Sequence, residues 1–404
     1  MRRPIKRAPR KLSADGQRLT TLAKAIIQAS SRVEERQWEG QMDSLLQRLL
    51  RTRHQETLDI ALDQLFNEAP MAYDALTDAA EAASESCLIE QNGVRYDALL
   101  LAAPILAWTR FAIASGPIPA DMVATLSAHL HAHILASDAR MAMAPMLFSI
   151  DQLPRTHSEI HLLTQQMAQA ALHGTPIKTV AQPAETAPFL ADTRYLLAAI
   201  AVPVGEPLFR WQATSNLADR DEALAQWNTQ AMPNIARLLP GCGIELLLPE
   251  AYFVACREGD KQIRPASIRA AVHYLIHTLG VEAPALQAVI GGFGEDGERV
   301  DEYRIGFALV NQSDILYGVI WPLYGDEEAE ENAFGMLEAE PRKSPLEEIH
   351  ALLEESGIIR IKRHLEQFSM ESCDDCGAPL FADPDGELVH AEMPEEAVNP
   401  EHLH

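Results

Sequence analysis

The chain has 404 residues, of which 47% are hydrophobic and 23% charged, a mixture typical of globular proteins. This composition excludes a disordered polymer, a collagen-like or low-complexity repeat, and a small disulfide-linked scaffold. Asp and Glu outnumber Lys and Arg by 58 to 33, so the formal net charge is −25, and most of the surface will repel nucleic-acid phosphates and anionic lipid. One hydrophobic core rarely supports this length, so we expect two or more packed units.

The first twelve residues hold six basic side chains and no acid. Pro4 and Pro9 favour an extended conformation, so we interpret this tail as disordered and suited to weak, salt-sensitive contact with nucleic acid or an acidic protein. It could equally fold back onto the acidic C-terminal segment. No apolar signal-peptide region follows it, and the longest apolar run, residues 98–108, is too short to cross a bilayer. We therefore expect no membrane contact. The odd number of cysteines, five, favours a reducing compartment, so we expect the protein to be cytoplasmic.

Residues 13–84 are predicted to be helical. Ser13 can cap a first helix, and Ser31 with Glu34 has the spacing of a capping box ahead of a second. A third apolar pattern of helical period covers residues 58–66.

The pattern then changes to β structure. Residues 87–90, a turn at Asn92 and Gly93, and an apolar arm beginning at Val94 predict a β-hairpin.

From this hairpin onward, the order strand, helix, strand, helix occurs twice. The predicted strands are residues 98–108, 139–150, 195–204 and 244–248, and the predicted helices are residues 119–134, 156–172, 219–239 and 265–279. Gly174 and Gly280 end the last helix of each unit. We interpret this as an internal duplication, although any alternating α/β chain would give a similar order. Residues 252–263 either extend the last strand or begin a helix.

After Gly280, apolar segments at residues 286–292, 300–310 and 315–324 predict an antiparallel β meander. Residues 326–340 carry seven acids and no base, as a solvated loop would.

Beyond this acidic stretch, Ser344, Pro345 and Glu347 form a capping box that predicts a helix to about residue 355. A last strand is expected at residues 358–361.

These patterns predict a mixed α+β fold in which a helical section precedes two similar strand-helix-strand-helix units, an antiparallel meander and a zinc-knuckle-like tail. The predicted segments are a basic tail at 1–12, the helical section at 13–84, the first α/β unit at 85–180, the second unit with the meander at 190–370, and an acidic tail at 371–404.

The strongest chemical motif is Cys373-Asp-Asp-Cys376-Gly-Ala-Pro. Two cysteines with this spacing form a knuckle that suits zinc. His390, fourteen residues after Cys376, is the expected third ligand, and His364, His402 or His404 could be the fourth.

The composition of the tail favours a metal. Residues 371–401 carry ten acids and no Lys or Arg, so this segment lacks apolar surface to order itself, and zinc would supply that stability. The alternatives are a redox dithiol or inert cysteines. The thioredoxin-type alternative is weak, because Gly377, Pro379, Pro384 and Gly386 forbid the helix that such a dithiol opens.

Several other motifs have structural interpretations. The stretch from Gly292 to Gly297 matches GxGxxG, but no helix follows it, so we predict a hairpin turn. Cys242 and Cys256 are expected to be core thiols. Histidine pairs four residues apart could bind a metal, yet each is expected to be a surface or partly buried helix pair: 129 and 133, 157 and 161, and 273 and 277.

Three segments together carry a family resemblance: L-S-x-x-x-x-R-L at residues 12–19, F-S-I-D-Q-L-P at 148–154, and C-x-x-C-G-A-P-L-F continuing to H-A-E-M-P at 390–394. Over nearly its whole length, the chain resembles an uncharacterised bacterial domain-of-unknown-function family of about four hundred residues. The resemblance implies a bacterial cytoplasmic protein, and it supplies no activity, ligand or catalytic residue.

Two functions are compatible with these observations. The first is a non-enzymatic binding or regulatory protein with a structural zinc site, because the chain lacks catalytic motifs and has ends of opposite charge. The second is an enzyme with an active site in the cleft between the two α/β units, where a ligand would be expected. Its first candidate residues follow equivalent strands: Asp151, Arg155, Glu250 and Arg264.

Overall fold

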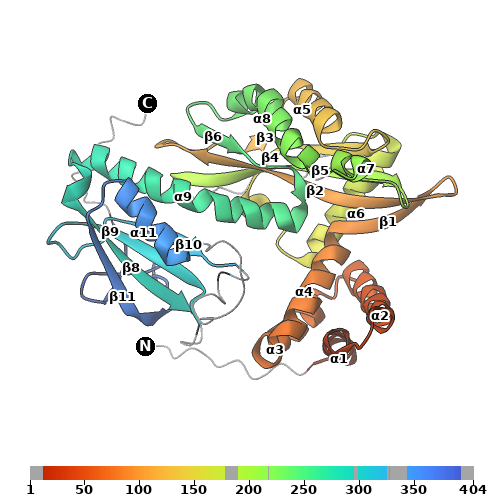
Figure 1. Cartoon of the computed structure of the whole chain (residues 1–404), viewed down its shortest axis with the longest axis horizontal. Coiled ribbons are helices and arrows are strands. Elements are labelled where there is room, and N and C mark those ends of the chain that lie inside the picture. The colour runs from red at the N-terminus through yellow and green to blue at the C-terminus, as the bar shows by residue number, and fades with distance from the viewer. Residues whose placement is uncertain are drawn as a thin grey trace.

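The structure is a computed structural model that describes residues 12–177, 190–216, 218–294, 299–324, 327 and 344–392. Figure 1 shows three parts: a helical N-terminal section, a large sheet with helices on both faces, and a smaller sheet, with helix α9 reaching from the large sheet to the small one. The mixed α+β class predicted from the sequence is confirmed.

Four helices form the N-terminal section: α1 (Ala14–Gln28), α2 (Arg32–Arg51), α3 (Gln55–Glu68) and α4 (Pro70–Glu85). Ser13 Oγ accepts a hydrogen bond from Gly16 N–H, and Ser31 Oγ accepts one from Glu34 N–H, so both predicted caps are confirmed. Helix α4 lies within the predicted helical section, although the sequence pattern did not mark it as a separate helix; it begins with a proline at its first position and packs against the other three helices.

The large sheet has seven strands: β1 (Ser86–Gln91), β2 (Val94–Trp108), β3 (Gly116–Pro117), β4 (Arg140–Ser149), β5 (Ala191–Pro203), β6 (Gly243–Leu246) and β7 (Glu250–Ala251). The order is β1-β2-β5-β4-β3, and β6 and β7 also pair with β2. The predicted hairpin is confirmed, with Asn92 and Gly93 both at positive φ in the turn between β1 and β2.

Helices cover both faces of this sheet, which explains why its central strands are apolar on both sides. On one face lie α5 (Ala120–His133) and α8 (Ala218–Leu238), and on the other lie α6 (His157–His173) and the first half of α9 (Tyr252–Leu279). Short helices complete the connections: α7 (Arg210–Thr214), and the 3-10 helices η1 (Ile150–Gln152) and η2 (Ala283–Ala285).

The two predicted strand-helix-strand-helix units interleave within this one sheet. Strands β4 and β2 of the first unit alternate with β5 and β6 of the second, in the order β4-β5-β2-β6. With α5 and α8 on the same face, this is the split β-α-β arrangement of ferredoxin-like folds. Residues 96–108 of β2 pair with residues 203–191 of β5, so backbone pairing fills the junction where a cleft was expected.

Helix α9 begins earlier than the pattern after Pro265 predicted. It runs without a break from Tyr252 to Leu279, and residues 252–263 are helical. Pro265 has no N–H to donate to the carbonyl of Lys261, one helical turn earlier. Arg264 Nε donates to that oxygen at 3.0 Å, so the side chain next to the proline satisfies the carbonyl.

The smaller sheet has the order β10-β9-β8-β11, with β8 (Leu286–Gly294), β9 (Glu302–Leu309), β10 (Tyr317–Pro322) and β11 (Arg360–Ser369). The meander β8-β9-β10 is antiparallel, as predicted. Strand β11 begins within the predicted residues 358–361 and pairs parallel to β8, because α11 (Pro345–Glu355) carries the chain back across the sheet. The second half of α9 packs beside α11 on that face.

Buried Arg264 joins α9 to the smaller sheet. Its guanidinium donates to Pro322 O at 2.8 Å, forms a two-pronged pair with Glu327 at 2.8 and 2.9 Å, and lies 4.7 Å from the centre of the Trp321 ring. Arg264 was a candidate catalytic residue, but its polar contacts are with the protein itself. It therefore acts as a structural clamp.

We expect Arg264→Met to lower the free energy of unfolding by about 3–5 kcal/mol, because it leaves Glu327 without its cation and two carbonyls without donors. Arg269→Met, on the same helix, removes only an exposed pair with Glu355 and should cost at most about 1 kcal/mol. Urea unfolding of both variants measures the difference. Equal losses would contradict the clamp.

The N-terminal section meets α9 through two glutamates of α4. Glu81 pairs with Arg257 through both carboxylate oxygens, at 2.6 and 2.7 Å, and Glu85 accepts a hydrogen bond from Phe253 N–H at the start of α9. Burial raises the pKa of Glu85 to about 7, the hydrogen bond from Phe253 opposes this rise, and the nearby charge of Glu81 adds to it. Between pH 4.5 and about pH 7, the Glu85 carboxyl is therefore mostly protonated in the folded chain and mostly ionised in the unfolded chain.

A raised folded-state pKa makes Glu85 stabilising when protonated, and that contribution is lost as pH rises from the unfolded value, 4.5, through about 7. We expect Glu85→Gln to be more stable than the parent at pH 8 by about 2 kcal/mol and nearly equal to it at pH 5. Thermal unfolding at both pH values tests this, with the exposed Glu90→Gln as control. A gain of the same size at both pH values would contradict it.

Candidate metal centre

The segment after β11 forms a knuckle that places two cysteines side by side. Cys373 N–H donates to Ala378 O at 2.7 Å, and Gly377 N–H donates to Cys373 O at 2.9 Å. Gly377 has φ +74°, a conformation that residues with a Cβ adopt rarely, so the turn requires glycine here. Ser372 and Pro379 close the turn as an isolated bridge.

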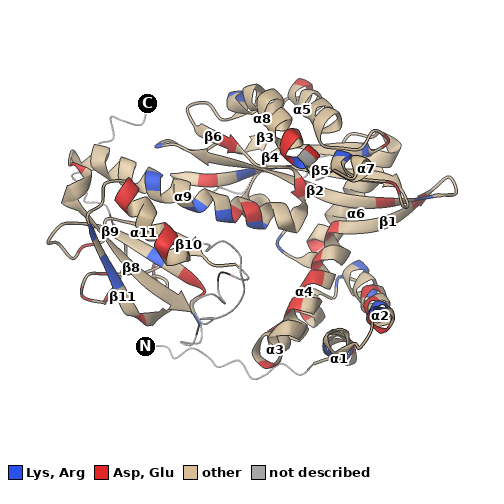
Figure 2. Cartoon of the chain, viewed as in Figure 1, with Lys and Arg blue, Asp and Glu red and all other residues tan. Residues whose placement is uncertain are grey.

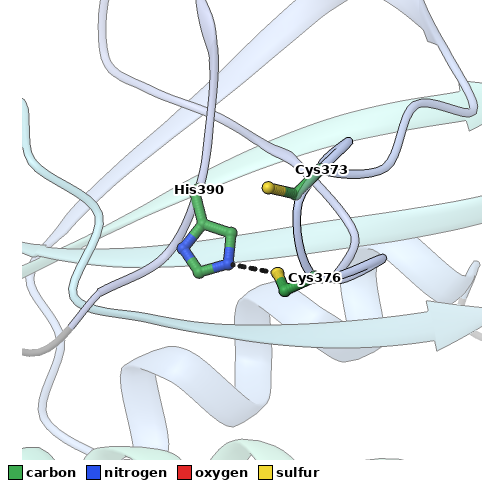
Figure 3. Close-up of side chains that lie close together, drawn as sticks. All are labelled: Cys373, Cys376 and His390. Carbon is green, nitrogen blue, oxygen red and sulfur yellow. Dashed lines mark hydrogen bonds between the residues drawn. The ribbon is translucent and has the colours of Figure 1, made fainter.

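A small hairpin then returns the chain to the knuckle. Strand β12 (Phe381–Ala382) pairs with β13 (Leu388–Val389), and His390 follows β13 directly. The ligand atoms of Cys373, Cys376 and His390 lie within 4.8 Å of one another, and His390 Nε2 is 3.2 Å from Cys376 Sγ (Figure 3). The structure thus brings together three of the predicted ligands.

The surroundings of this cluster favour metal-binding forms of its side chains. Hydrogen bonds from the backbone N–H groups of Cys376 and then Asp375 lower the pKa of Cys373, which favours the thiolate. On the far side of the imidazole, His390 Nδ1 lies 3.1 Å from Glu392 Oε1 but makes no hydrogen bond to it. This group could hold a metal ion.

Apolar packing anchors the same segment, contrary to the expectation that it cannot order itself. Phe381, Val389 and Ala391 pack against the face of the smaller sheet opposite α9 and α11. The ring of Phe381 lies over Gly318, where an added Cβ would clash with it. The sequence pattern hid this anchor because the complementary apolar surface belongs to the sheet.

Arg304 adds a polar anchor to this segment. Its guanidinium donates to the carbonyls of Glu371 and Leu380, at 2.8 and 2.6 Å, while its Nε donates to Glu302. These contacts fix the two ends of the knuckle to β9.

His364 does not join the cluster. It lies on β11, where its Nε2 is 2.8 Å from Asp383 O, its Nδ1 is 3.6 Å from Glu366, and its ring contacts Phe368 edge-on. The other two candidates for a fourth ligand, His402 and His404, lie outside the described residues, as do residues 1–11 of the basic tail.

Each residue first considered for an enzyme site has an ion-pair partner within the protein. Asp151 and Arg155 pair with each other at 3.4 Å on the surface, and Glu250 pairs with Arg220. Arg264 pairs with Glu327, as described above. The enzyme interpretation based on these residues stays a prediction.

Other sequence motifs also have structural explanations. Gly292 and Gly294 of the GxGxxG stretch lie in β8, which pairs antiparallel with β9, and the predicted turn falls on residues 295–298, which lie outside the described part. Burial raises the pKa of Cys242 and of Cys256, as expected for core thiols. Across the part of the chain that the structure describes, no histidine pair belongs to a metal-ligand cluster.

A pocket of about 760 Å³, which we call the junction pocket, lies where the end of β2 and the loop before β6 meet α9 and α11. Sequence reasoning missed it. The only signal was an aromatic and basic run, Trp108-Thr-Arg110-Phe111, at the end of a buried strand. Its lining residues are Trp108, Thr109, Arg110, Phe111, Leu190, Gly241, Glu245, Gln262, Pro265, Ala266, Arg269, Ala270, His273, Tyr274, Glu348 and Leu352.

Comparison with known proteins places the chain in a family. A family model described as "Protein of unknown function (DUF2863)" matches residues 4–404, so the chain belongs to that family and the full-length resemblance is confirmed. The searches of curated proteins and of solved structures found no match. Within the described residues, no helix combines the length and apolar character needed to cross a membrane.

Proposed function

We propose that the protein is a non-enzymatic binding or regulatory protein whose C-terminal segment is stabilised by one structural zinc ion. The convergence of Cys373, Cys376 and His390 supports this most directly. Thiolate and imidazole are the ligands that zinc prefers in structural sites, whereas Mg²⁺ and Ca²⁺ prefer oxygen.

In this proposal, zinc ties the knuckle to His390, the residue that follows β13. The ion would close the loop between Cys376 and His390 on the outer face of the smaller sheet, next to the apolar anchor of Phe381. A tetrahedral structural site needs a fourth ligand, for which His402 and His404 are the remaining candidates in the sequence. The apolar packing of Phe381 already orders this segment in part, and zinc would stabilise it further.

We expect the purified parent to carry about one zinc per chain, and Cys373→Ser, Cys376→Ser and His390→Ala each to lose most of it. His364→Ala is the matched control and should retain the metal. Elemental analysis measures the content, and replacement by Co²⁺ should give thiolate-to-metal absorption that weakens stepwise with each cysteine removed. A metal-free parent that also fails to bind added Zn²⁺ would contradict the site.

A second candidate function is the binding or conversion of a small molecule in the junction pocket. Its volume lies within the range of known ligand sites, it lies between two sheets, and its lining combines aromatic side chains with two arginines and two glutamates. An amphipathic molecule carrying both charges would complement such a lining.

Filling the junction pocket should separate this candidate from the first. If the pocket holds a ligand, native mass spectrometry of gently purified parent should show an added small mass that Ala266→Trp abolishes. Ala132→Trp, on the exposed side of α5, should keep it. A parent without added mass, or a mass retained by Ala266→Trp, would count against the junction pocket.

A further inference from the structure

A second concave surface lies on the helical N-terminal section, far in the sequence from the metal cluster. It is a groove of about 650 Å³ between α1, α2 and α4, which we call the acidic groove. Its lining residues are Ile26, Ile27, Glu35, Glu39, Asp43, Met71, Asp74, Ala75, Asp78, Ala79, Ala82, Ala83 and Ser86. On α4 the lining residues span 71–83, about 18 Å of helix or just over three turns, and Ser86 follows at the start of β1.

The floor of the acidic groove is apolar. Ile26 and Ile27 of α1 lie across the groove from three small residues of α4, Ala75, Ala79 and Ala82. Larger side chains at these three positions would fill the groove. Ile27 is 41% exposed and Met71, on the rim, is 67% exposed. A flexible methionine beside exposed isoleucine is typical of surfaces that receive an apolar partner.

Two rows of carboxylates form the walls. Glu35, Glu39 and Asp43 follow one another at four-residue spacing on α2, and Asp74 and Asp78 do so on α4. The lining contains no Lys or Arg. Figure 2 shows the acidic residues along α4, and basic residues among the acidic ones on α2.

Two basic side chains lie near the groove: Arg257, which pairs with Glu81 and lies close enough to Asp78 to interact with its charge, and Arg32. Arg32 pairs with Glu35 at 2.8 Å and with Glu39 at 3.1 Å, and its side chain is largely exposed. Exposed ion pairs of this kind contribute little free energy, so a cation on an incoming ligand can replace Arg32.

We propose that the acidic groove binds a basic amphipathic helix of a partner protein. Its apolar face would lie on the isoleucine and alanine floor, and its Lys or Arg side chains would extend their methylene stems over the rim to the carboxylates. Nucleic acid is disfavoured because its phosphates would face five acids, and a bare metal ion would not use the apolar floor. The site is independent of the zinc proposal.

The test uses the full chain and a labelled synthetic helix of fourteen residues made of leucine and lysine. Fluorescence anisotropy should show saturable binding that weakens as salt rises. Asp74→Asn with Asp78→Asn should weaken binding about tenfold and flatten its salt dependence. The matched pair Asp59→Asn with Asp63→Asn, two exposed acids on neighbouring α3, should leave both unchanged.

The apolar floor has its own variant. Ile27→Ser should weaken binding about fivefold while leaving the salt dependence unchanged, because it removes contact area and no charge. Circular dichroism confirms that each variant is folded.

Three results of the binding assay would overturn the proposal, and so would one result on self-association. The first is an absence of binding. The second is equal binding by the two double variants, which would indicate adsorption to a generally acidic surface. The third is equal binding of a control peptide that has glutamate in place of lysine. Self-association of the chain that the Asp74 and Asp78 pair abolishes would also overturn it, by assigning the groove to a second copy.

Discussion

Helix α9 packs against two sheets at once, and the other parts of the molecule are arranged around this shared helix. Its first half buries Tyr252 and Ala255 against the large sheet, and its second half buries Ile268 and Leu275 against the small one. Pro265 interrupts the hydrogen-bond ladder between the two halves, and Arg264 both replaces the missing donor and reaches the second sheet. Because α4 caps the start of the same helix, the N-terminal section is joined to this axis as well.

Local patterns predicted the elements well wherever the cause was local. The caps at Ser13 and Ser31, the turn at Asn92 and Gly93, and the meander all depend on residues adjacent in sequence, and all are confirmed. The sequence left residues 252–263 open between strand and helix, and the structure has the helix. The helix predicted to follow Pro265 is the second half of α9, because a neighbouring arginine compensates for the proline. Strand interleaving and the parallel pairing of β11 depend on contacts between distant segments, which periodicity does not record.

The candidate sites divide in the same way. Cysteine spacing and a histidine fourteen residues later were enough to predict the cluster, because a knuckle and a hairpin are short-range structures. His364 was an error of the same method, since a histidine near the motif in sequence lies on another strand with its own acceptor. The junction pocket and the acidic groove consist of ordinary residues from three or more elements, so no motif marks either of them.

The alternation of β4, β5, β2 and β6 has a consequence for how the large sheet can be divided. Within the set β4, β5, β2 and β6, every pairing joins a strand of one predicted unit to a strand of the other, so neither unit alone contains a paired β-α-β core. Expressed separately, a half would present unprotected strand edges and an uncovered apolar surface. Such fragments would be expected to regain order by reassembling with each other, and the continuous chain is thus the covalently linked form of an intertwined pair.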